Sequence, residues 1–363
     1  MTADLDPLAV VRRRLAAHGL TGRAPFAAVA EAVAWFGGMQ AQEYAEAQWS
    51  IGMRVQDATA SDVEAACDRG EILRTHVLRP TWHFVAAADL RWLLRLTGHR
   101  VQAKSAGRRR ELGLDDETLA RCHEVIATVL RDGEPRTRRE LGAELEAAGI
   151  DMAGQRLPHT LGHAELAGVV ASGPRRGKQH TYRLIDDRVP AAPQRSREAD
   201  VAELVRRYFT SHGPATLRDF AWWSGLTLTD GRAGLAACGE QLVGVQAPDG
   251  TLWVSAATPA PARDRRESEA LLLGTYDELT VAHRDLRNVH ADGRATNELP
   301  IRPIVVDGLT VGGWTRRLAR REVTIAAVLE SPLDKRQGAA LHAAADRFGA
   351  FVGLPARLES RPA

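Results

Sequence analysis

The residues whose types could do chemistry lie in one short segment, where two glutamines flank an alanine just after a pair of glycines (Gly37-Gly38-Met39-Gln40-Ala41-Gln42). In an extended segment alternate side chains point the same way, so the two amides would share one face. An amide takes no proton at neutral pH, but it can orient a water molecule and offer a carbonyl dipole to a cation. Spacing alone leaves a second interpretation open, a helix entrance where glutamine is merely tolerated.

The rest of the sequence lacks the signatures of common enzyme classes. It contains no HExxH pair, no Walker-type phosphate loop, no nucleophile elbow and no zinc-deaminase pattern. Three widely spaced cysteines, Cys67, Cys122 and Cys238, make neither a metal-binding pair nor a disulfide framework and are predicted to be buried thiols. The sequence therefore predicts no metal and no other cofactor.

The positive charge is carried by arginine and is gathered in clusters. Of 48 basic residues only Lys104, Lys178 and Lys335 are lysines, and the net charge is +2. Arginines are adjacent at positions 108–110, and Arg175, Arg176 and Lys178 share one short loop. A high-GC codon bias explains the excess of arginine, but local basic stripes on a near-neutral protein also favour phosphate binding on one face.

The elements that must position these residues follow a repeated pattern of three helices and two short strands. The chain is expected to be α+β, mainly α, with three tandem winged helix-turn-helix units at 1–112, 113–190 and 198–260 around a concave DNA channel. A C-terminal α+β region, 261–363, carries a hairpin signal. The hairpin tips are expected at Arg79–Pro80, 173–178, Asp249–Gly250 and Asp307–Gly308. No apolar run approaches the ~18 residues of a membrane helix, and we expect a cytoplasmic protein.

Three helices with a basic wing indicate DNA binding, because a recognition helix fits the major groove and a wing reaches the adjacent groove or backbone. Winged helices also serve as protein-interaction modules, which is the alternative. The candidate DNA contacts are Arg79, His83, Arg108, Arg109, Arg175, Arg176, Lys178, Asp307 and Gly308.

For several of these positions a structural role is the alternative. His83 and His76 could be hydrogen-bonded structural histidines, and Arg79 could cap its own turn. Trp222 and Trp223 suit core packing better than base stacking. Asp277 and Glu278 could lie near the site or form a salt bridge with a nearby arginine.

The sequence resembles the AlkZ-like bacterial DNA glycosylases, which are tandem winged-helix enzymes that act on alkylated and cross-linked DNA. The segments that carry the resemblance are Gln40-Ala41-Gln42, 78–83 (Leu-Arg-Pro-Thr-Trp-His), 212–216 (His-Gly-Pro-Ala-Thr), 220–225 (Phe-Ala-Trp-Trp-Ser-Gly), 275–278 (Thr-Tyr-Asp-Glu) and 302–308 (Arg-Pro-Ile-Val-Val-Asp-Gly). The Gln-x-Gln signature separates this branch from the related YcaQ-type branch, which carries Gln-x-Asp.

The resemblance implies that Gln40 and Gln42 are catalytic and place a water molecule near the sugar carbon. Two amides stabilise the transition state only weakly, so they suit a base that is already a good leaving group. N7-alkylguanine is such a base because it is cationic. The expected enzyme is monofunctional, because no lysine lies close in sequence to form a Schiff base. It would act as a monomer on duplex DNA carrying an alkylated purine, including bulky or interstrand-crosslink adducts, in repair or in self-resistance to a genotoxin. The alternative is a non-catalytic DNA-binding regulator or damage-binding resistance factor.

Overall fold

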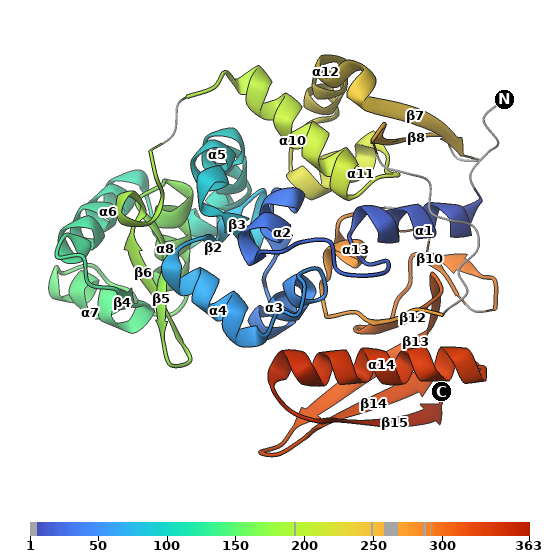
Figure 1. The fold of residues 1–363 in the computed structure, drawn as a ribbon. Coiled ribbons are helices and arrows are strands. Elements are labelled where there is room, and N and C mark those ends of the chain that lie inside the picture. The colour runs from blue at the N-terminus through green and yellow to red at the C-terminus, as the bar shows by residue number, and fades with distance from the viewer. Residues whose placement is uncertain are drawn as a thin grey trace.

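A computed structural model describes residues 6–191, 194–247, 250–257, 268–284, 286, 288–290 and 292–363. It shows an α+β fold in which three units with one element order follow each other (Figure 1). Unit one consists of α2 (Val29–Phe36), β1 (Met39–Gln40), α3 (Tyr44–Gly52), α4 (Ala60–Arg69), β2 (Ile72–Val77) and β3 (Arg79–Ala86). Unit two consists of α6 (Asp116–Leu130), β4 (Arg136–Thr137), α7 (Arg138–Ala147), α8 (Arg156–Leu166), β5 (Val170–Arg176) and β6 (Gln179–Leu184).

Unit three repeats the order with α10 (Arg197–Ser211), α11 (Leu217–Ser224), α12 (Leu228–Cys238), β7 (Leu242–Ala247) and β8 (Gly250–Ser255). In each unit the segment after the first helix pairs with the last strand of the hairpin, as β1 with β3, β4 with β6, and Ala215 with Trp253. This is the winged helix-turn-helix arrangement, so the repeated pattern seen in the sequence is confirmed. The turn expected at Asp249–Gly250 falls partly outside the described residues.

The connecting elements are α1 (Pro7–Ala17), the long α5 (Ala87–Glu111), the one-turn α9 (Ile185–Arg188) and η1 (Gly239–Gln241). After unit three come β9 (Ala270–Leu272), α13 (Glu278–Val281), β10 (Asn288–Val289), β11 (Ala295–Thr296), β12 (Pro303–Val306), β13 (Leu309–Leu318), β14 (Val323–Leu329), α14 (Lys335–Val352) and β15 (Ala356–Pro362). Five of these strands form one sheet in the order β15-β14-β13-β12-β9, and α14 packs on it (Figure 1).

The hydrophobic cores cross the boundaries between these parts. Unit one and the C-terminal sheet share one core, in which Trp49 packs edge-to-face against Phe348 and at a tilt against Phe351 of α14. A second core joins α5 and the β2–β3 hairpin to unit three. Unit two has a separate core of its own. No helix among the described segments has the length and apolar character needed to cross a membrane.

The hairpin tips differ in exposure from what the sequence predicted. The β2–β3 tip is not a projecting wing, because Leu78 turns there with a φ of 62°, is only 1% exposed, and donates its N–H to Thr97 of α5. The 307–308 tip is also covered. Gly308 is buried beside Leu8 and Arg12 of α1, and the Asp307 carboxylate accepts the backbone N–H of Glu269. The expectation that Asp307 and Gly308 enter a DNA groove is therefore wrong.

Candidate functional site

The Gln-x-Gln segment is an extended strand and its continuation. Gln40 pairs with His83 across β1 and β3, and Ala41, which is fully buried, donates its N–H to the carbonyl of Trp82 at 2.7 Å. Helix α3 begins only at Tyr44. Gln40 therefore lies in strand β1, whereas Gln42 lies in the bend that enters α3, as the helix-entrance interpretation expected. The contacts of the two glutamine side chains with Arg79 and Thr81, which alternate along β3, place both on one side.

The corresponding segments of units two and three are built differently. There the helix that follows the short strand begins with a threonine capping box, Thr137 with Glu140 and Thr216 with Asp219. Helix α3 begins after Glu43, whose side chain makes no capping bond. Unit one thus carries the amide pair at the place where its sister units carry a structural cap.

The two amides are held by different neighbours. The Gln40 carbonyl oxygen Oε1 accepts from Nη2 of Arg79 at 3.1 Å, and the Gln42 Oε1 accepts from the hydroxyl of Thr81 at 3.0 Å. Gln40 is half-buried, whereas Gln42 is exposed. Because arginine only donates, the contact with Arg79 fixes the orientation of the Gln40 amide and leaves its NH₂ group directed elsewhere.

Glu278 anchors the backbone at the same point. Its Oε1 accepts the N–H of Gln40 at 2.5 Å, while Oε2 faces the indole Nε1 of Trp223 at 3.0 Å and Nε2 of His212 at 3.3 Å. The carboxylate is 1% exposed. Unit one, unit three and α13 therefore meet at Gln40, and a carboxylate with both oxygens engaged is not free to act as a general base.

Asp277 makes the salt bridge that the sequence left as one possibility. Its carboxylate faces the Arg54 guanidinium through two contacts of 2.9 Å and accepts from the Ser50 hydroxyl at 2.5 Å. The pair is fully buried, and the Arg54 charge lowers the pKa of Asp277 although burial opposes this. Asp277 also caps α13, so the pair fixes the turn that presents Glu278.

Arg74 is a part of the site that the sequence did not reveal. Its Nε donates to the carbonyl of Ala41 at 2.9 Å and its Nη2 to that of Gln42 at 3.3 Å. The guanidinium lies 4.2 Å from the ring centre of Trp82 and 5.9 Å from that of Tyr44. Its only signal in the sequence was that it is an arginine within β2. This strand pairs with β3, which carries Arg79 and Thr81.

A family model described as DNA glycosylase AlkZ-like matches residues 33–351. The chain belongs to the AlkZ-like DNA glycosylase family. An interstrand DNA cross-link repair glycosylase of Streptomyces sahachiroi is 27% identical over 302 residues, which is 76% of this chain and 79% of that protein. The structure of the Streptomyces sahachiroi DNA glycosylase AlkZ superimposes with a TM-score of 0.76 over 99% of this chain and 100% of that one, at 20% identity.

Arg175 and Arg176 of unit two in this AlkZ-like chain are paired in the free protein. Arg175 contacts Glu64 of α4 at 2.9 Å and lies over the ring of Tyr44, and Arg176 contacts Glu140 at 2.7 Å. Lys178 is exposed at the β5–β6 tip. Tyr44 touches both Arg74 and Arg175, so the end of β5 near the tip of the second wing lies beside the Gln-x-Gln segment.

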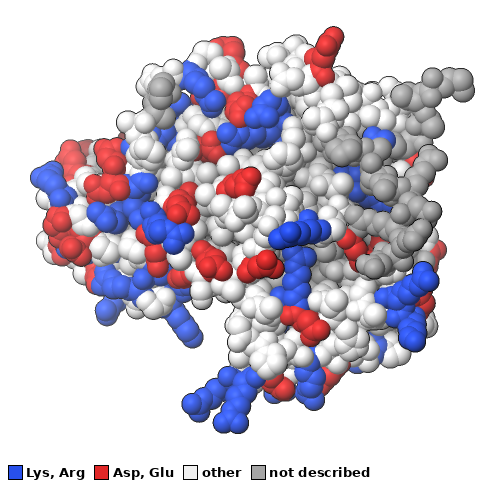
Figure 2. Space-filling model, viewed as in Figure 1, with Lys and Arg blue, Asp and Glu red and all other residues white. Residues whose placement is uncertain are grey.

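The arginines at the end of α5 lie in a different neighbourhood. Arg108 contacts Glu111 at 2.7 Å and Gln155, and Arg109 donates to the carbonyl of Gln102. None of these contacts involves the glutamine segment. On the face seen in Figure 2 acidic and basic side chains alternate, and no continuous basic stripe is visible there.

His83 is a structural histidine and not a DNA contact. It is fully buried, and its Nδ1 lies 3.0 Å from the carbonyl of Thr81. Burial lowers the pKa of His83 well below its usual value, with the Arg79 charge acting in the same direction. The expectation that His83 binds DNA does not hold in the free protein, because its side chain is fully buried, although it lies on the same face of the β1–β3 pair as Gln40.

We expect His83 to make folding stability depend on pH. Because its folded-state pKa is lowered, its contribution is complete above an unfolded-state pKa of about 6.5 and is lost as the pH falls below it. Between pH 6.5 and 5.5 the parent should lose roughly 1 kcal/mol more unfolding free energy than His83→Gln. Urea unfolding at both pH values measures this difference. Parallel pH dependences would contradict it.

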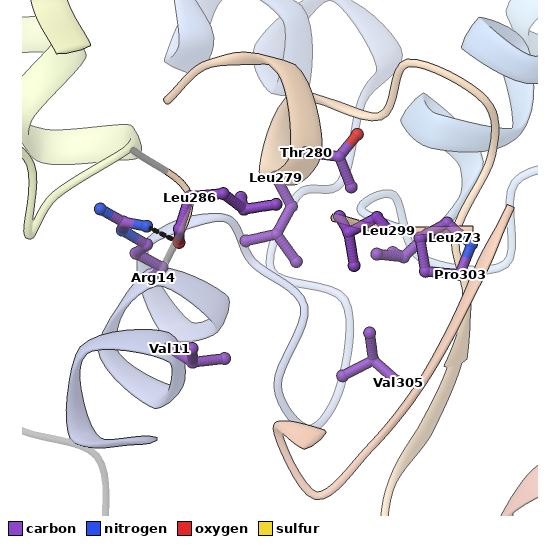
Figure 3. A pocket seen from close by; sticks show the side chains of 9 residues that line it. All are labelled: Val11, Arg14, Leu273, Leu279, Thr280, Leu286, Leu299, Pro303 and Val305. Atoms are coloured by element: carbon purple, nitrogen blue, oxygen red, sulfur yellow. Dashed lines mark hydrogen bonds between the residues drawn. The ribbon is translucent and has the colours of Figure 1, made fainter. Parts of the chain in front are cut away.

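A separate cavity lies beside α13 and α1 (Figure 3). Its lining is apolar except for Thr280 and Arg14, whose guanidinium bonds the carbonyl of Leu286. The cavity measures about 20 Å³, room for one water molecule. It is too small for a nucleobase, and the Gln-x-Gln segment remains the candidate site.

Proposed function

We propose that this protein is a monofunctional DNA glycosylase that hydrolyses the N-glycosidic bond of N7-alkylated guanine, including bulky and interstrand-crosslink adducts. The observation that carries the proposal is the pair of side-chain amides on one face, held by Arg79 and Thr81, with the backbone N–H of Gln40 bound by the buried Glu278. The partner is duplex DNA with an alkylated purine, bound by one copy of the chain along a concave channel between the three units. Neither a metal nor another cofactor takes part.

The chemistry follows from what amides can do. As the base leaves, positive charge builds on the sugar, and a water molecule must attack the same carbon. The Gln42 oxygen keeps a second lone pair for a hydrogen of that water, and the Gln40 NH₂ group can donate to the water oxygen. Neither amide removes a proton, so the glycosidic bond breaks as the water attacks the cationic sugar carbon, and the extra proton of the water passes to solvent. This mechanism needs a leaving group that is already activated. A guanine alkylated at N7 is cationic before reaction and meets this need.

The lysine positions support a monofunctional reaction. Lys104 lies in α5, Lys178 at the β5–β6 tip and Lys335 at the start of α14. Among the described contacts, none joins a lysine to the Gln-x-Gln segment. A Schiff base with the sugar is therefore not part of the proposed reaction, and the product is an intact strand with an abasic site.

The extension to cross-links rests on the name of the Streptomyces sahachiroi relative, an interstrand DNA cross-link repair glycosylase. A role in self-resistance to a genotoxin would follow from the same substrate class. We place the activity in the cytoplasm, on nucleoid DNA. The competing proposal is a non-catalytic protein that binds damaged DNA, as a regulator or as a resistance factor.

The deciding experiment incubates the purified protein with duplex DNA carrying 7-methylguanine. We expect released 7-methylguanine in the supernatant and strands that break only after alkali treatment. Breakage without alkali would contradict the monofunctional assignment. Tight binding without any released base would favour the non-catalytic alternative.

Arg79 is predicted to position Gln40 rather than to hold phosphate. Arg79→Ala should lower the single-turnover excision rate about tenfold, because the Gln40 amide loses its fixed orientation, while the affinity for DNA stays within about twofold. Guanidinium added to Arg79→Ala should restore part of the rate. A variant that binds DNA more weakly with a reduced salt dependence, yet excises normally at saturation, would return Arg79 to the phosphate contacts.

A further inference from the structure

Tyr276 is an exposed tyrosine beside the Gln-x-Gln segment, and the proposed reaction gives it no role. It is 43% exposed. It precedes Glu278 by two residues, which span at most about 7 Å of extended chain. The Glu278 carboxylate in turn accepts the N–H of Gln40 at 2.5 Å. The tyrosine is therefore anchored at the place where Gln40 is held.

The backbone of Tyr276 adopts a conformation that bulky residues avoid. Its φ is 63°, in the left-handed region. In the described segments three other non-glycine residues have a positive φ. Two of them, Asp57 and Asp307, are aspartates, which tolerate this region, and the third, Leu78, is buried in a core. Tyr276 differs from all three because it presents a large side chain to solvent.

The two neighbours of Tyr276 hold this conformation in place. The N–H of Thr275 donates to the carboxylate of Glu46 at 3.3 Å, and Glu46 is itself only 3% exposed. On the other side Asp277 is paired with Arg54 in the core. Backbone strain persists only where the surrounding structure fixes it, and it is found most often at functional sites. The fold thus keeps an aromatic ring facing solvent at a cost in stability.

The ring of Tyr276 is free to bind a partner. Among the residues that the structure describes, it packs against no other aromatic ring and its hydroxyl has no hydrogen-bond partner. The nearby carboxylates of Asp277 and Glu278 are already engaged. An aromatic face carries negative potential and attracts cations. N7-alkylguanine is a flat cation, so it matches an exposed ring in both shape and charge.

We infer that Tyr276 is a specificity-determining residue, which stacks on the face of the alkylated guanine and favours it over a neutral base. An undamaged guanine gains only stacking from the ring, whereas a cationic guanine also gains the attraction between its charge and the ring. The inference rests on the proposed function, because it takes N7-alkylguanine as the substrate. Glu43 is the alternative source of selectivity, since its carboxylate is exposed next to Gln42.

The first measurement compares the binding of two duplexes that differ in one charge. One carries 7-methylguanine on a sugar fluorinated at C2′, which blocks hydrolysis and leaves the base cationic. The other carries 7-methyl-7-deazaguanine, a neutral base of the same shape. Tyr276→Leu should reduce the preference of the parent for the cationic duplex by about threefold to thirtyfold, and Tyr276→Phe should keep it. The same preference in the parent and Tyr276→Leu would overturn the inference.

A second series separates the charge of the ring from its size. Tyr276 is replaced by phenylalanine and then by phenylalanines with increasing numbers of ring fluorines. Each fluorine withdraws electron density from the ring face and changes the shape little, so the preference for the cationic duplex should fall stepwise. A preference that stays constant along the series would show that the ring provides apolar contact alone, and the inference would be wrong.

Two control variants test the surroundings of Tyr276. Ile301 is 77% exposed, and its neighbour Arg302 bonds the same Glu46 that holds Thr275. Ile301→Ala removes an apolar side chain without a ring and should leave the ratio of the two affinities unchanged. Glu43→Gln should also keep most of the preference. Loss of the preference in Glu43→Gln, together with its retention in Tyr276→Leu, would assign recognition of the cation to the carboxylate.

The backbone strain gives an independent readout. Glycine adopts a φ of 63° freely, so Tyr276→Gly should unfold at a urea concentration no lower than the parent, while it loses the preference for the cationic duplex. Unfolding at a much lower concentration would show that the ring is structural and would overturn the inference.

Excision of 7-methylguanine from an unfluorinated duplex separates this inference from the proposed function. A parent that excises the base, with a preference that does not depend on Tyr276, would contradict this inference alone. A parent that excises nothing, yet prefers the cationic duplex through Tyr276, would contradict the proposed function and leave this inference standing.

Discussion

Replacing Gln40 and Gln42 together with alanine is expected to slow base excision by about 10²–10³-fold, because removal of a preorganised polar group from a reacting centre has an effect of that size. The affinity for DNA carrying 7-methylguanine should stay within about twofold, since neither amide is placed to grip phosphate. Single-turnover excision and a binding titration on the same duplex measure the two quantities. Excision at the parental rate would remove the catalytic assignment.

Two controls sharpen this experiment. Gln194→Ala with Gln246→Ala removes two exposed amides from other parts of the chain and should leave excision unchanged. Gln42→Asp introduces a carboxylate at the exposed position, as in the Gln-x-Asp branch. If it supports excision, position 42 faces the sugar. Unfolding of this variant would instead show that Gln42 is needed for structure, contrary to its exposure.

Breaking the buried pair of Arg54 and Asp277 is expected to have the largest effect on stability. Asp277→Ala leaves the Arg54 charge buried without its partner, and such changes cost about 3–5 kcal/mol of unfolding free energy. Urea unfolding measures the loss, and Asp277→Asn, which keeps an oxygen for the α13 cap, should lose less. Since the pKa of Asp277 is lowered, the parental advantage is present above about pH 4 and disappears as the pH falls through the folded-state pKa. A loss below about 1 kcal/mol would contradict this account.

The sequence predicted the repeated units because their signals are local. Helical periodicity, the capping box at Thr137 and the glycine-containing turn at 173–178 each act within a few residues, and each corresponds to an element of the fold. The extended Gln-x-Gln segment was likewise visible in alternation. The partner that binds this segment was not visible in the sequence, because Gln40 and Glu278 are 238 residues apart.

The wrong predictions share a physical cause. An Arg-Pro step is typical of an exposed turn. At the β2–β3 bend Pro80 is exposed, but Arg79 is only half-exposed and the apolar Leu78 is buried. An Asp-Gly step predicts a hairpin correctly and says nothing of its exposure, which α1 decides by covering Gly308. Whether a charged side chain is free or paired depends on neighbours brought in by the fold. For that reason the sequence predicted Arg175 as a free DNA contact, and it did not single out the exposed arginines at 317–321.

The bond between Gln40 and Glu278 also bears on when the protein can first work. A chain emerges from the ribosome N-terminus first, at about 5–20 residues per second, so the acceptor for the Gln40 N–H arrives roughly 10–50 s after the donor. Until then the apolar face that unit one shares with the C-terminal sheet has no cover. A nascent or prematurely ended chain can therefore carry all three winged units and still lack an ordered glutamine pair. Under the proposed function, base removal is therefore expected only after the C-terminal segment has been made.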